Sequence, residues 1–459
     1  MRLPFLDRRE ELARLRTLLA DRERGLAVLY GRRRCGKSRL LLEALKSSRS
    51  AYYVGDDREG AVQRAAVATA IGRLLPGFDK VTYPDWDALL GRWYSEAPPK
   101  GVLVLDEFPS LVSAAPELAS LLQKHVDQGP LKPVHLVLAG SSQRMMQGLV
   151  LDRSAPLFGR AREILRIDPL PAGWIQKALA EKDPVRAVEA YAVWGGVPRY
   201  WELAADHANL MDAVSALVLS PLGVLHDEPT GLLLDDLREI AQAASILSLI
   251  GSGIHRLSEL AARLEKPATS LAHPMRRLLD LGMVGRETPH GTSPRDSKRT
   301  LYRISDPFLR FWFRFVEPNR SALETMPLER VAREVGRDLG QHVAGVWEDL
   351  ARASVPRLRA FGYEWKPASR WWGPGLDRKP MEIDLVAESA DGAAVLFGEV
   401  KWGVEVDPSH LLAALHRKAA NWPFSSGRKP CFVAFLPSLR KRLGGLRVVT
   451  AAQVMRALL

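Results

Sequence analysis

The sequence has few cysteines and no long apolar run. Its only two cysteines, Cys35 and Cys431, lie far apart and form no metal-binding spacing, so both are expected to be free thiols in a reducing compartment. No apolar run reaches 18 residues, and the first residues, "MRLPFLDRREEL", include acids where a signal peptide would be apolar. These absences predict a cytoplasmic protein without a membrane span.

The length and charge of the chain limit its organisation and partners. A chain of 459 residues is too long for one ordinary core, so two to four domains are expected. The formal net charge is +12, and residues 330–459 carry 20 Lys and Arg against 13 Asp and Glu, more than half of the excess. This surplus permits a nucleic acid or another polyanion as partner without proving one.

A phosphate-binding loop follows the first apolar strand. The stretch "GLAVLYGRRRCGKSRLLLEAL" predicts a strand over Leu26–Tyr30, a loop and a leucine-rich helix, and "GRRRCGKS" fits G-x-x-x-x-G-K-[ST]. Glycines let the loop wrap closely, so that its N–H groups face phosphate oxygens. Lys37 would reach the β and γ phosphates of ATP, and Ser38 would bind Mg²⁺. The predicted nucleotide-binding residues of this loop are Gly31, Arg32, Arg33, Arg34, Cys35, Gly36, Lys37 and Ser38.

A pair of acids completes the predicted ATPase site. In "GVLVLDEFPSL" the apolar run Val102–Leu105 predicts a buried strand, and Asp106 and Glu107 follow at its C-terminal end, where ligands of α/β sheets bind. Asp106 would hold the Mg²⁺ together with Ser38, while Glu107 would orient and deprotonate the attacking water. The alternative, a strand that ends in solvated acids, is weaker beside the phosphate-binding loop.

Two further features have both a functional and a structural interpretation. Ser141 and Ser142 follow the strand in "HLVLAGSSQRMM", and their hydroxyls, that of Ser142 above all, are candidate sensors of the γ phosphate; a Gly-Ser turn is the alternative. Arg160 and Arg162 precede a fifth strand, and either of them, Arg160 above all, is a candidate arginine finger that would act across the interface of a homo-oligomer. An exposed surface arginine is the alternative.

Several stretches resemble an AAA+-like branch of P-loop ATPases close to the signal-transduction ATPases (STAND). They are "FLDRREELARL", "GRRRCGKS", "LVLDEF", "LAGSS", "FGRAREI" and "WGGVPRYW". The resemblance implies an ATPase core with a five-stranded parallel sheet over 1–170, a helical lid over 171–235, and an ATP-driven switch or motor. It places Gly195, Gly196 and Pro198 in the lid near the nucleotide, although the same residues also suit a helix-breaking turn.

The middle of the chain, 236–320, is typical of a winged helix. Helical patterns around 235–250, 256–266 and 270–281 precede a hairpin around the basic loop "HGTSPRDSKR". If this domain binds DNA, its cations would contact phosphates. Packing against another domain is an equally open alternative. The candidate phosphate contacts are Arg276, Arg277, Arg295, Lys298 and Arg299.

The tail contains two charged residues in an apolar strand. In "MEIDLVAESADGAAVLFGEVKW", Asp391-Gly392 predicts a two-residue hairpin turn, which would place Asp384 opposite Glu399 and Glu382 opposite Lys401. Opposed residues have Cβ atoms about 4.5–5.5 Å apart, where two carboxylates repel unless a cation lies between them. Carboxylate oxygens suit Mg²⁺ or Mn²⁺. The alternative is a solvated face with a Glu382–Lys401 ion pair.

Asp384 followed by Glu399-Val400-Lys401 resembles the PD-(D/E)xK nuclease superfamily, with Ile383 in place of the usual Pro. The resemblance implies that Asp384 and Glu399 bind Mg²⁺ and that Lys401 positions or activates the attacking water. All three would be catalytic residues of a domain over 330–459.

Two more residues of the tail are candidates with open alternatives. The resemblance offers Glu348 as a third metal ligand, although a solvated helix acid is as good a reading. Lys418 would meet a phosphate or is simply a surface lysine.

The whole order resembles a family of archaeal and bacterial ATPases whose C-terminal region is a domain of unknown function, with "RISDPFLRFWFRFVEPN" as a recognisable stretch. We therefore expect an α/β protein with a P-loop ATPase sheet and lid, a winged helix and a restriction-endonuclease-like tail. Its expected function is ATP hydrolysis coupled to DNA binding and Mg²⁺-dependent phosphodiester cleavage. The alternative is a non-nucleolytic signalling or regulatory switch that binds DNA or proteins.

Overall fold

The computed structural model of the chain describes residues 3–128, 132–236, 240–292, 299–403, 407–424, 427–439 and 444–459. It divides into two compact units, Asp7–Pro169 and the remainder, Met1–Leu6 with Leu170–Leu459. The predicted lid (171–235), winged helix (236–320) and tail (330–459) all lie in the second unit. Their separation into three domains stays a prediction.

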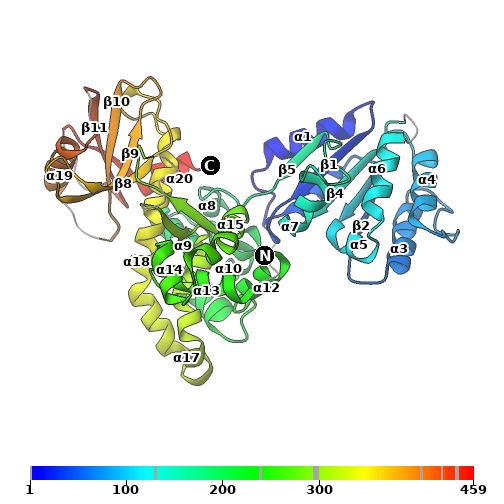
Figure 1. Ribbon diagram of the computed structural model, residues 1–459, viewed down its shortest axis with the longest axis horizontal. Coiled ribbons are helices and arrows are strands. Elements are labelled where there is room, and N and C mark those ends of the chain that lie inside the picture. Colours follow the sequence, from blue (N-terminus) through cyan, green and yellow to red (C-terminus); the bar gives the residue numbers. More distant parts are fainter. Residues whose placement is uncertain are drawn as a thin grey trace. The chain divides into compact units, whose positions relative to one another are not determined.

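The first unit is built on a five-stranded parallel sheet (Figure 1). Its strand order is β2-β3-β4-β1-β5, and every neighbouring pair is parallel. The central strands are apolar and buried on both faces, as parallel strands covered by helices are. The predicted parallel sheet is therefore confirmed. The strands are β1 (Gly25–Tyr30), β2 (Ser50–Val54), β3 (Val102–Asp106), β4 (His135–Gly140) and β5 (Glu163–Arg166).

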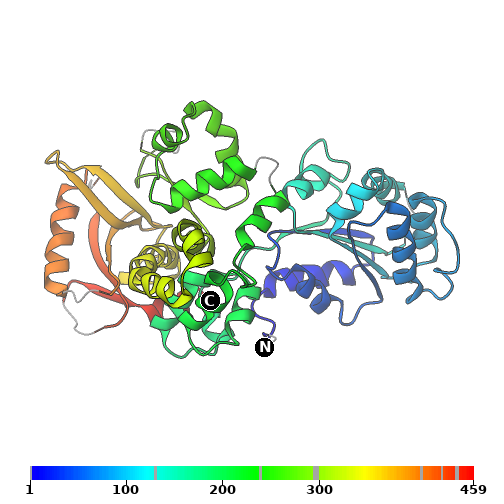
Figure 2. The same cartoon turned by 90° about the horizontal axis from the view of Figure 1, so that it is seen from below.

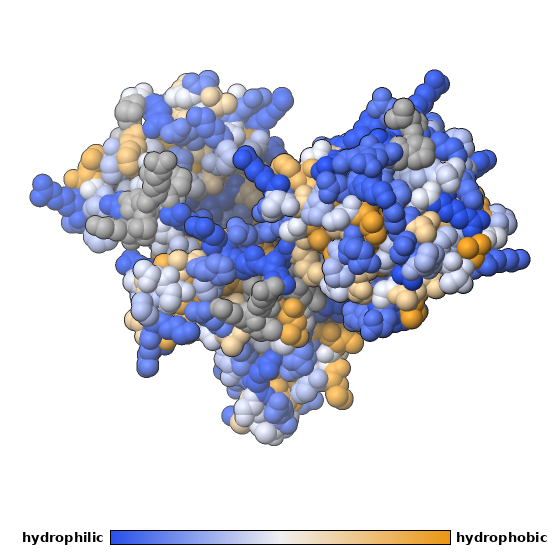
Figure 3. Space-filling model, turned by 45° about the vertical axis from the view of Figure 1, so that its right-hand side comes forward, coloured by the Kyte–Doolittle hydropathy of each residue, from blue (hydrophilic) through white to orange (hydrophobic). Residues whose placement is uncertain are grey.

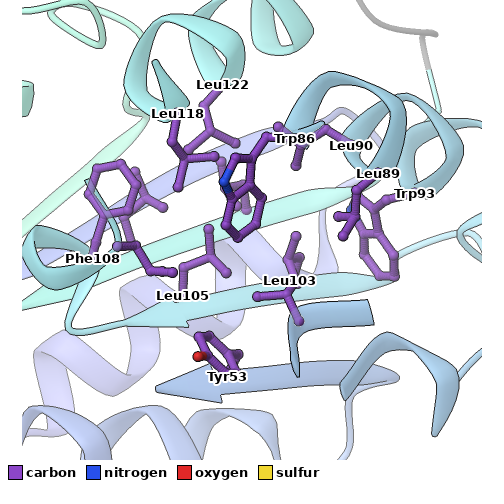
Figure 4. Packing of buried hydrophobic residues seen from close by; sticks show 14 of the residues in the cluster. Tyr53, Trp86, Leu89, Leu90, Trp93, Leu103, Leu105, Phe108, Leu118 and Leu122 are labelled. Carbon is purple, nitrogen blue, oxygen red and sulfur yellow. The ribbon is translucent and has the colours of Figure 1, made fainter. Parts of the chain in front are cut away.

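Helices cover the sheet of the first unit. One group packs alternate strand residues such as Leu103 and Leu105 against Trp86, Phe108 and Leu118 (Figure 4). This group is α3 (Gly60–Gly72), α4 (Trp86–Glu96), α5 (Phe108–Ala114) and α6 (Leu118–Gln128). Another pair, α1 (Arg9–Ala20) and α2 (Lys37–Leu45), packs together, and α1 lies against β1 and β5. After β4 come α7 (Gln143–Met146) and the π-helical turn η1 (Gln147–Leu151).

The second unit begins with short lid helices, followed by the predicted three helices and hairpin. The structure places these later helices at α13 (Ile240–Gly251), α14 (Leu257–Arg263) and α15 (Ala272–Asp280), with the 3₁₀ turn η3 (Ala268–Leu271) before the last. The strands β6 (Val284–Glu287) and β7 (Leu301–Ile304) pair antiparallel. The predicted order of elements is present, while the winged-helix assignment stays a prediction. The lid elements are α8 (Trp174–Ala178), α9 (Pro184–Trp194), α10 (Pro198–Ala204), α11 (Leu210–Val214), η2 (Ser215–Leu219) and α12 (Glu228–Asp236).

A long helix packs against both the predicted lid and the tail. After α16 (Pro307–Phe315), η4 (Glu317–Asn319) and α17 (Arg320–Thr325), helix α18 (Leu328–Ser354) packs against α9 and β10. Figures 1 and 2 show this yellow helix beside both the green lid helices and the orange strands of the tail. Helix α18 therefore contacts both the predicted lid and the C-terminal sheet.

The tail is a separate mixed sheet in the order β12-β11-β10-β9-β8. Strands β8 to β10 are antiparallel, whereas β10 to β12 are parallel. The strands are β8 (Ser369–Pro374), β9 (Pro380–Glu388), β10 (Ala394–Val400), β11 (Lys429–Leu436) and β12 (Arg447–Thr450). The remaining elements are η5 (Val355–Arg357), η6 (Ala360–Gly362), α19 (Pro408–Asn421), which connects β10 to β11, and α20 (Ala451–Ala457), which packs on α9 and α18.

The hairpin between β9 and β10 corrects one prediction and confirms another. The connection occupies residues 389–393 and is longer than the two-residue turn expected at Asp391-Gly392. The Ser389 hydroxyl accepts from the Ala394 N–H at 2.9 Å and donates to Asp391 at 2.6 Å, so a side chain closes the wider loop. The predicted register nevertheless holds, because Phe397 pairs with Val386 and Gly398 with Leu385.

Polar side chains dominate the face of the molecule in Figure 3, with hydrophobic residues scattered among them. No helix within the described ranges is long and apolar enough to cross a membrane.

Candidate active sites

The phosphate-binding loop connects β1 to α2 and is closed by its own lysine. Lys37 is buried, and its ammonium donates to the carbonyl oxygens of Gly31 at 2.7 Å and Arg32 at 3.1 Å. Gly31 has φ 144°, and a Cβ there would lie 2.3 Å from the Ile167 oxygen, so only glycine fits. Gly36 has φ 93° and leads into α2. The loop is therefore preorganised around one ammonium that can bind phosphate.

Asp106 lies at the carboxyl end of β3, where it faces the phosphate-binding loop. Its Oδ2 accepts the Ser38 hydroxyl at 2.7 Å and the Tyr52 hydroxyl at 2.5 Å, and its Oδ1 accepts the Glu107 N–H at 3.0 Å. The structure thus joins the predicted Mg²⁺ residues Ser38 and Asp106. A hydroxyl and a carboxylate at this edge fit a hard divalent cation. Such an ion would neutralise phosphate charge there.

Glu107, the candidate base, is held by the end of the next strand. Its backbone has φ 49°, a left-handed conformation that only a few non-glycine residues adopt. Its carboxylate accepts the Ser141 hydroxyl, which lies 2.7 Å from both Oε atoms, and the Ser141 N–H at 3.1 Å. Ser141 therefore orients the predicted base. Ser142 instead caps α7, accepting from the Met145 N–H at 3.3 Å, and its sensor role stays a prediction.

Arg160 is already paired within the first unit. Its guanidinium forms a bidentate ion pair with the Asp127 carboxylate, in which Nε and Nη2 each lie 2.8 Å from an oxygen. Its Nη1 donates to Pro156 O at 3.0 Å. Arg160 precedes β5, so it lies at the amino edge of the parallel sheet, opposite the phosphate-binding loop. It cannot serve its own nucleotide, and a finger role would require a neighbouring subunit. That role stays a prediction.

The lid glycines end one helix and begin another. Gly195 terminates α9 with φ 58°, and its carbonyl accepts the Trp201 indole N–H at 2.7 Å. Pro198 is the first residue of α10, where its missing N–H costs nothing. The helix-breaking reading of Gly195, Gly196 and Pro198 therefore accounts for these residues. Their proximity to nucleotide stays a prediction.

The predicted acids and lysine of the tail meet at one point of the C-terminal sheet. The Lys401 ammonium lies 2.7 Å from Glu399 Oε1 and 3.5 Å from Asp384 Oδ2. The second Glu399 oxygen accepts from Lys418 at 2.7 Å, and Asp384 Oδ2 accepts the Val400 N–H at 2.9 Å. Two carboxylates therefore share one cation. We call Asp384, Glu399, Lys401 and Lys418 the tail cluster.

The electrostatics of the tail cluster separate its two acids. Burial raises the pKa of Asp384, and the negative charge of Glu399 raises it further. Burial would also raise the pKa of Glu399, but Lys418 and Lys401 outweigh it, so that this pKa is lowered. Burial would lower the pKa of Lys401, yet the bond to Glu399 and the charge of Asp384 raise it overall. Lys401 is therefore a persistent cation.

One prediction about the tail acids is wrong, and another is left open. The Glu382–Lys401 ion pair is wrong, because Glu382 binds Arg370 on β8 while Lys401 binds the other two acids. Glu348 lies on α18 and contacts Arg352 at 3.5 Å. Burial raises the pKa of Glu348, and the charge of Asp384 adds to this rise.

The metal-ligand set in the tail is small. No group of three or more His, Cys, Asp and Glu side chains suited to a metal occurs among the residues described. A metal there would therefore rest on Asp384 and Glu399 with water or substrate oxygens, as Mg²⁺ often does. Glu348 as a third ligand stays a prediction.

The hairpin of the second unit packs against the tail. The His290 N–H donates to Arg370 O at 2.9 Å, and its ring Nδ1 lies 2.7 Å from the Ser369 hydroxyl on β8. This contact supports the alternative of packing against another domain. Arg276 and Arg299 are nonetheless exposed, and Arg277 is half-buried. Arg295 and Lys298 lie outside the described residues.

Sequence reasoning missed Tyr52 and understated Lys418. Tyr52 has no motif around it; only the pairing of β2 with β3 brings its strand beside Asp106. For Lys418, the helical spacing from the buried Leu411 and Leu415 on α19 was an available signal, because it places residue 418 on the sheet-facing side.

Comparisons with known proteins agree with the geometry of the first site. Residues 5–203 match the model of an ATPase domain found predominantly in Archaea. Residues 312–410 match a family described as archaeal and bacterial proteins of unknown function. An uncharacterised protein of Methanocaldococcus jannaschii is 28% identical over 422 residues, covering 90% of this chain and 92% of the relative.

Solved structures extend the comparison of the fold. A Walker-type ATPase of Pyrococcus abyssi has a TM-score of 0.51 at 18% identity, over 68% of this chain and 96% of that one. The Aeropyrum pernix ORC2 protein, solved as ADPNP-ADP complexes, reaches a TM-score of 0.42 at 18% identity, over 75% of this chain and 97% of that one. This second likeness is too weak to carry an argument. The first likeness shows the fold alone, while the domain match and the loop geometry support an ATPase.

Proposed function

We propose that the chain is an ATP-dependent DNA-processing enzyme. ATP hydrolysis in the first unit is coupled to Mg²⁺-dependent phosphodiester cleavage by the tail. The observation that carries this proposal is the convergence of Asp384, Glu399 and Lys401, with two carboxylates in reach of one ammonium. Oxygen ligands for a divalent metal beside a fixed cation are a combination that can support cleavage of a phosphodiester.

Each member of the tail cluster has a role in this proposal. Asp384 and Glu399 would hold Mg²⁺, which when bound would supply neutralisation of phosphate charge and activation of a water. Lys418 binds Oε2 of Glu399 and so restricts the direction in which Oε1 points. Lys401 orients the attacking water and stabilises negative charge at the phosphate.

The second unit would also bind the DNA. If 236–320 binds DNA as a winged helix does, the exposed Arg276 and Arg299 would contact its phosphates. The chain carries a net charge of +12, which favours a polyanion. Binding through phosphates predicts an affinity that falls steeply as salt rises. Assembly into a homo-oligomer would allow Arg160 to reach a neighbour's nucleotide.

Incubation of the full chain with plasmid DNA, Mg²⁺ and ATP tests the cleavage. Wild-type protein should nick or linearise the plasmid, and Lys401→Ala should abolish the cutting. Lys366→Ala is the matched control, because Lys366 is an exposed lysine of the tail that lies outside the tail cluster. Its ammonium lies 3.3 Å from a Glu388 oxygen. An intact plasmid, or equal cutting by Lys401→Ala, would reject the nuclease.

One observation favours a second function, a non-nucleolytic ATPase switch. Glu399 already binds two lysines at 2.7 Å, so the tail cluster is balanced in charge without a metal. In a switch, ATP binding would control assembly or DNA binding, and the cluster would only stabilise the fold. Lys37→Ala should then abolish assembly or DNA binding, while Lys401→Ala leaves both unchanged.

A further inference from the structure

Two adjacent tyrosines on β2 face opposite sides of the sheet. Tyr53 belongs to the apolar core cluster, and its hydroxyl lies 3.4 Å from Gln63 Oε1. Tyr52 faces the other way, and its hydroxyl donates to Asp106 Oδ2 at 2.5 Å. Because β2 pairs with β3 in parallel, Tyr52 lies beside Val104 and its side chain reaches forward to the strand end. The phenol therefore enters the nucleotide site from a neighbouring strand.

We infer that Tyr52 is a positioning residue for the Mg²⁺-nucleotide complex, acting through Asp106. The inference rests on the ATPase function. Asp106 is almost fully buried, and three donors surround its carboxylate: the Ser38 hydroxyl, the Tyr52 hydroxyl and the Glu107 N–H. Ser38 and Tyr52 both bind Oδ2, so the phenol determines how that oxygen is presented to Ser38.

A phenol suits this task because it remains a neutral donor. A tyrosine hydroxyl is uncharged at physiological pH and donates one hydrogen bond. A neutral donor orients the carboxylate without cancelling its negative charge, as a lysine or arginine would. Asp106 therefore keeps its full attraction for a divalent cation while its rotation is restricted.

The chain contains a matched control for removal of this hydroxyl. Tyr52→Phe and Tyr53→Phe each delete one phenolic oxygen from the same strand, but only Tyr52 contacts Asp106. Neither change creates a cavity, since the ring remains. A difference between the two variants therefore reports on the Asp106 contact rather than on β2.

The test is a fluorescence titration with an ADP analogue, first in EDTA and then with increasing Mg²⁺. Without the metal, Tyr52→Phe should bind nucleotide as wild type does. The Mg²⁺ concentration that it needs for half-maximal binding should rise about tenfold, which is about 1.4 kcal/mol, close to the lower end of the range for a hydrogen bond to a charged group. Tyr53→Phe should show the wild-type Mg²⁺ dependence.

Three results would overturn the inference. They are an unchanged Mg²⁺ requirement in Tyr52→Phe, an equal shift in Tyr53→Phe, or an equal loss of binding with and without Mg²⁺, which marks a merely structural role. Wild-type protein that binds no nucleotide at all would overturn the ATPase function as well. The two failures are therefore distinguishable.

Discussion

Lowering the pH should weaken the packing of α18 on the lid through His342. This side chain is 1% exposed, and its Nε2 lies 2.8 Å from Ala192 O on α9. A carbonyl only accepts, so Nε2 carries the hydrogen and Nδ1 is left as a lone pair. Nδ1 is buried and has no partner within the described part of the chain. Its surroundings are the rings of Phe311 and Phe315.

A proton on Nδ1 would therefore place a charge in an apolar site without an acceptor. Burial lowers the pKa of His342 from 6.5 to about 3; the Ala192 bond opposes this shift, and Arg310 and Arg314 add to it. Below pH 6.5, His342 is protonated in the unfolded chain but stays neutral in the folded chain until the pH nears about 3. The free energy of unfolding thus falls as pH falls, by about 2 kcal/mol between about pH 7 and about pH 5.

Urea unfolding followed by tryptophan fluorescence at these two pH values measures the effect. His342→Gln is the comparison, because its amide can still donate to Ala192 O but does not titrate. The variant should be less stable overall, and its pH-dependent loss should be smaller than that of wild type by about 2 kcal/mol. His255 and His290, whose pKa values burial also lowers, are present in both proteins and cancel. An equal pH dependence in the two proteins would refute the reasoning.

Three further changes test other parts of the structure. Asp349→Asn should cost about 1–2 kcal/mol in urea unfolding, because it removes the charge from a carboxylate that is 40% exposed and binds two arginines; an unchanged free energy of unfolding would contradict this network. Glu107→Gln should slow phosphate release by about 10²–10⁴-fold with nucleotide binding retained, and an unchanged rate would exclude it as the base. Gly31→Ala should abolish binding of a fluorescent nucleotide, since its Cβ would meet Ile167 O at 2.3 Å. Gly148→Ala, which meets nothing within 4 Å, should bind normally.

Local features of this chain could be predicted from sequence because the interacting residues are neighbours. The phosphate-binding loop from Gly31 to Ser38 is contiguous, and its glycines, lysine and serine each have one physical role there. The hairpin register over Val386 and Phe397 also followed from a short local turn, although the turn itself is longer than predicted. The register survived because Ser389 pairs with Ala394, so that the longer loop keeps its centre between Asp391 and Gly392. A change of a single turn residue would instead have turned every side chain of one strand to the other face.

The contacts that complete each site depend on the tertiary structure. Tyr52 reaches Asp106 because β2 lies next to β3 in the sheet, and Lys418 reaches Glu399 because α19 crosses back over β10. Arg160 is held by Asp127 from a separate helix. Helical spacing indicates only that Lys418 faces the sheet; which residue each of these three side chains meets is decided by the fold.

The sequence alone determined which groups could perform the chemistry: a phosphate-binding loop, two acids after β3, and two acids with a lysine in the tail. The tertiary structure decided what surrounds those groups, because strand order and helix crossings bring together residues that are far apart in the chain. The fold then sets the hydrogen bonds around Asp106, and burial shifts the pKa of Asp384 upward.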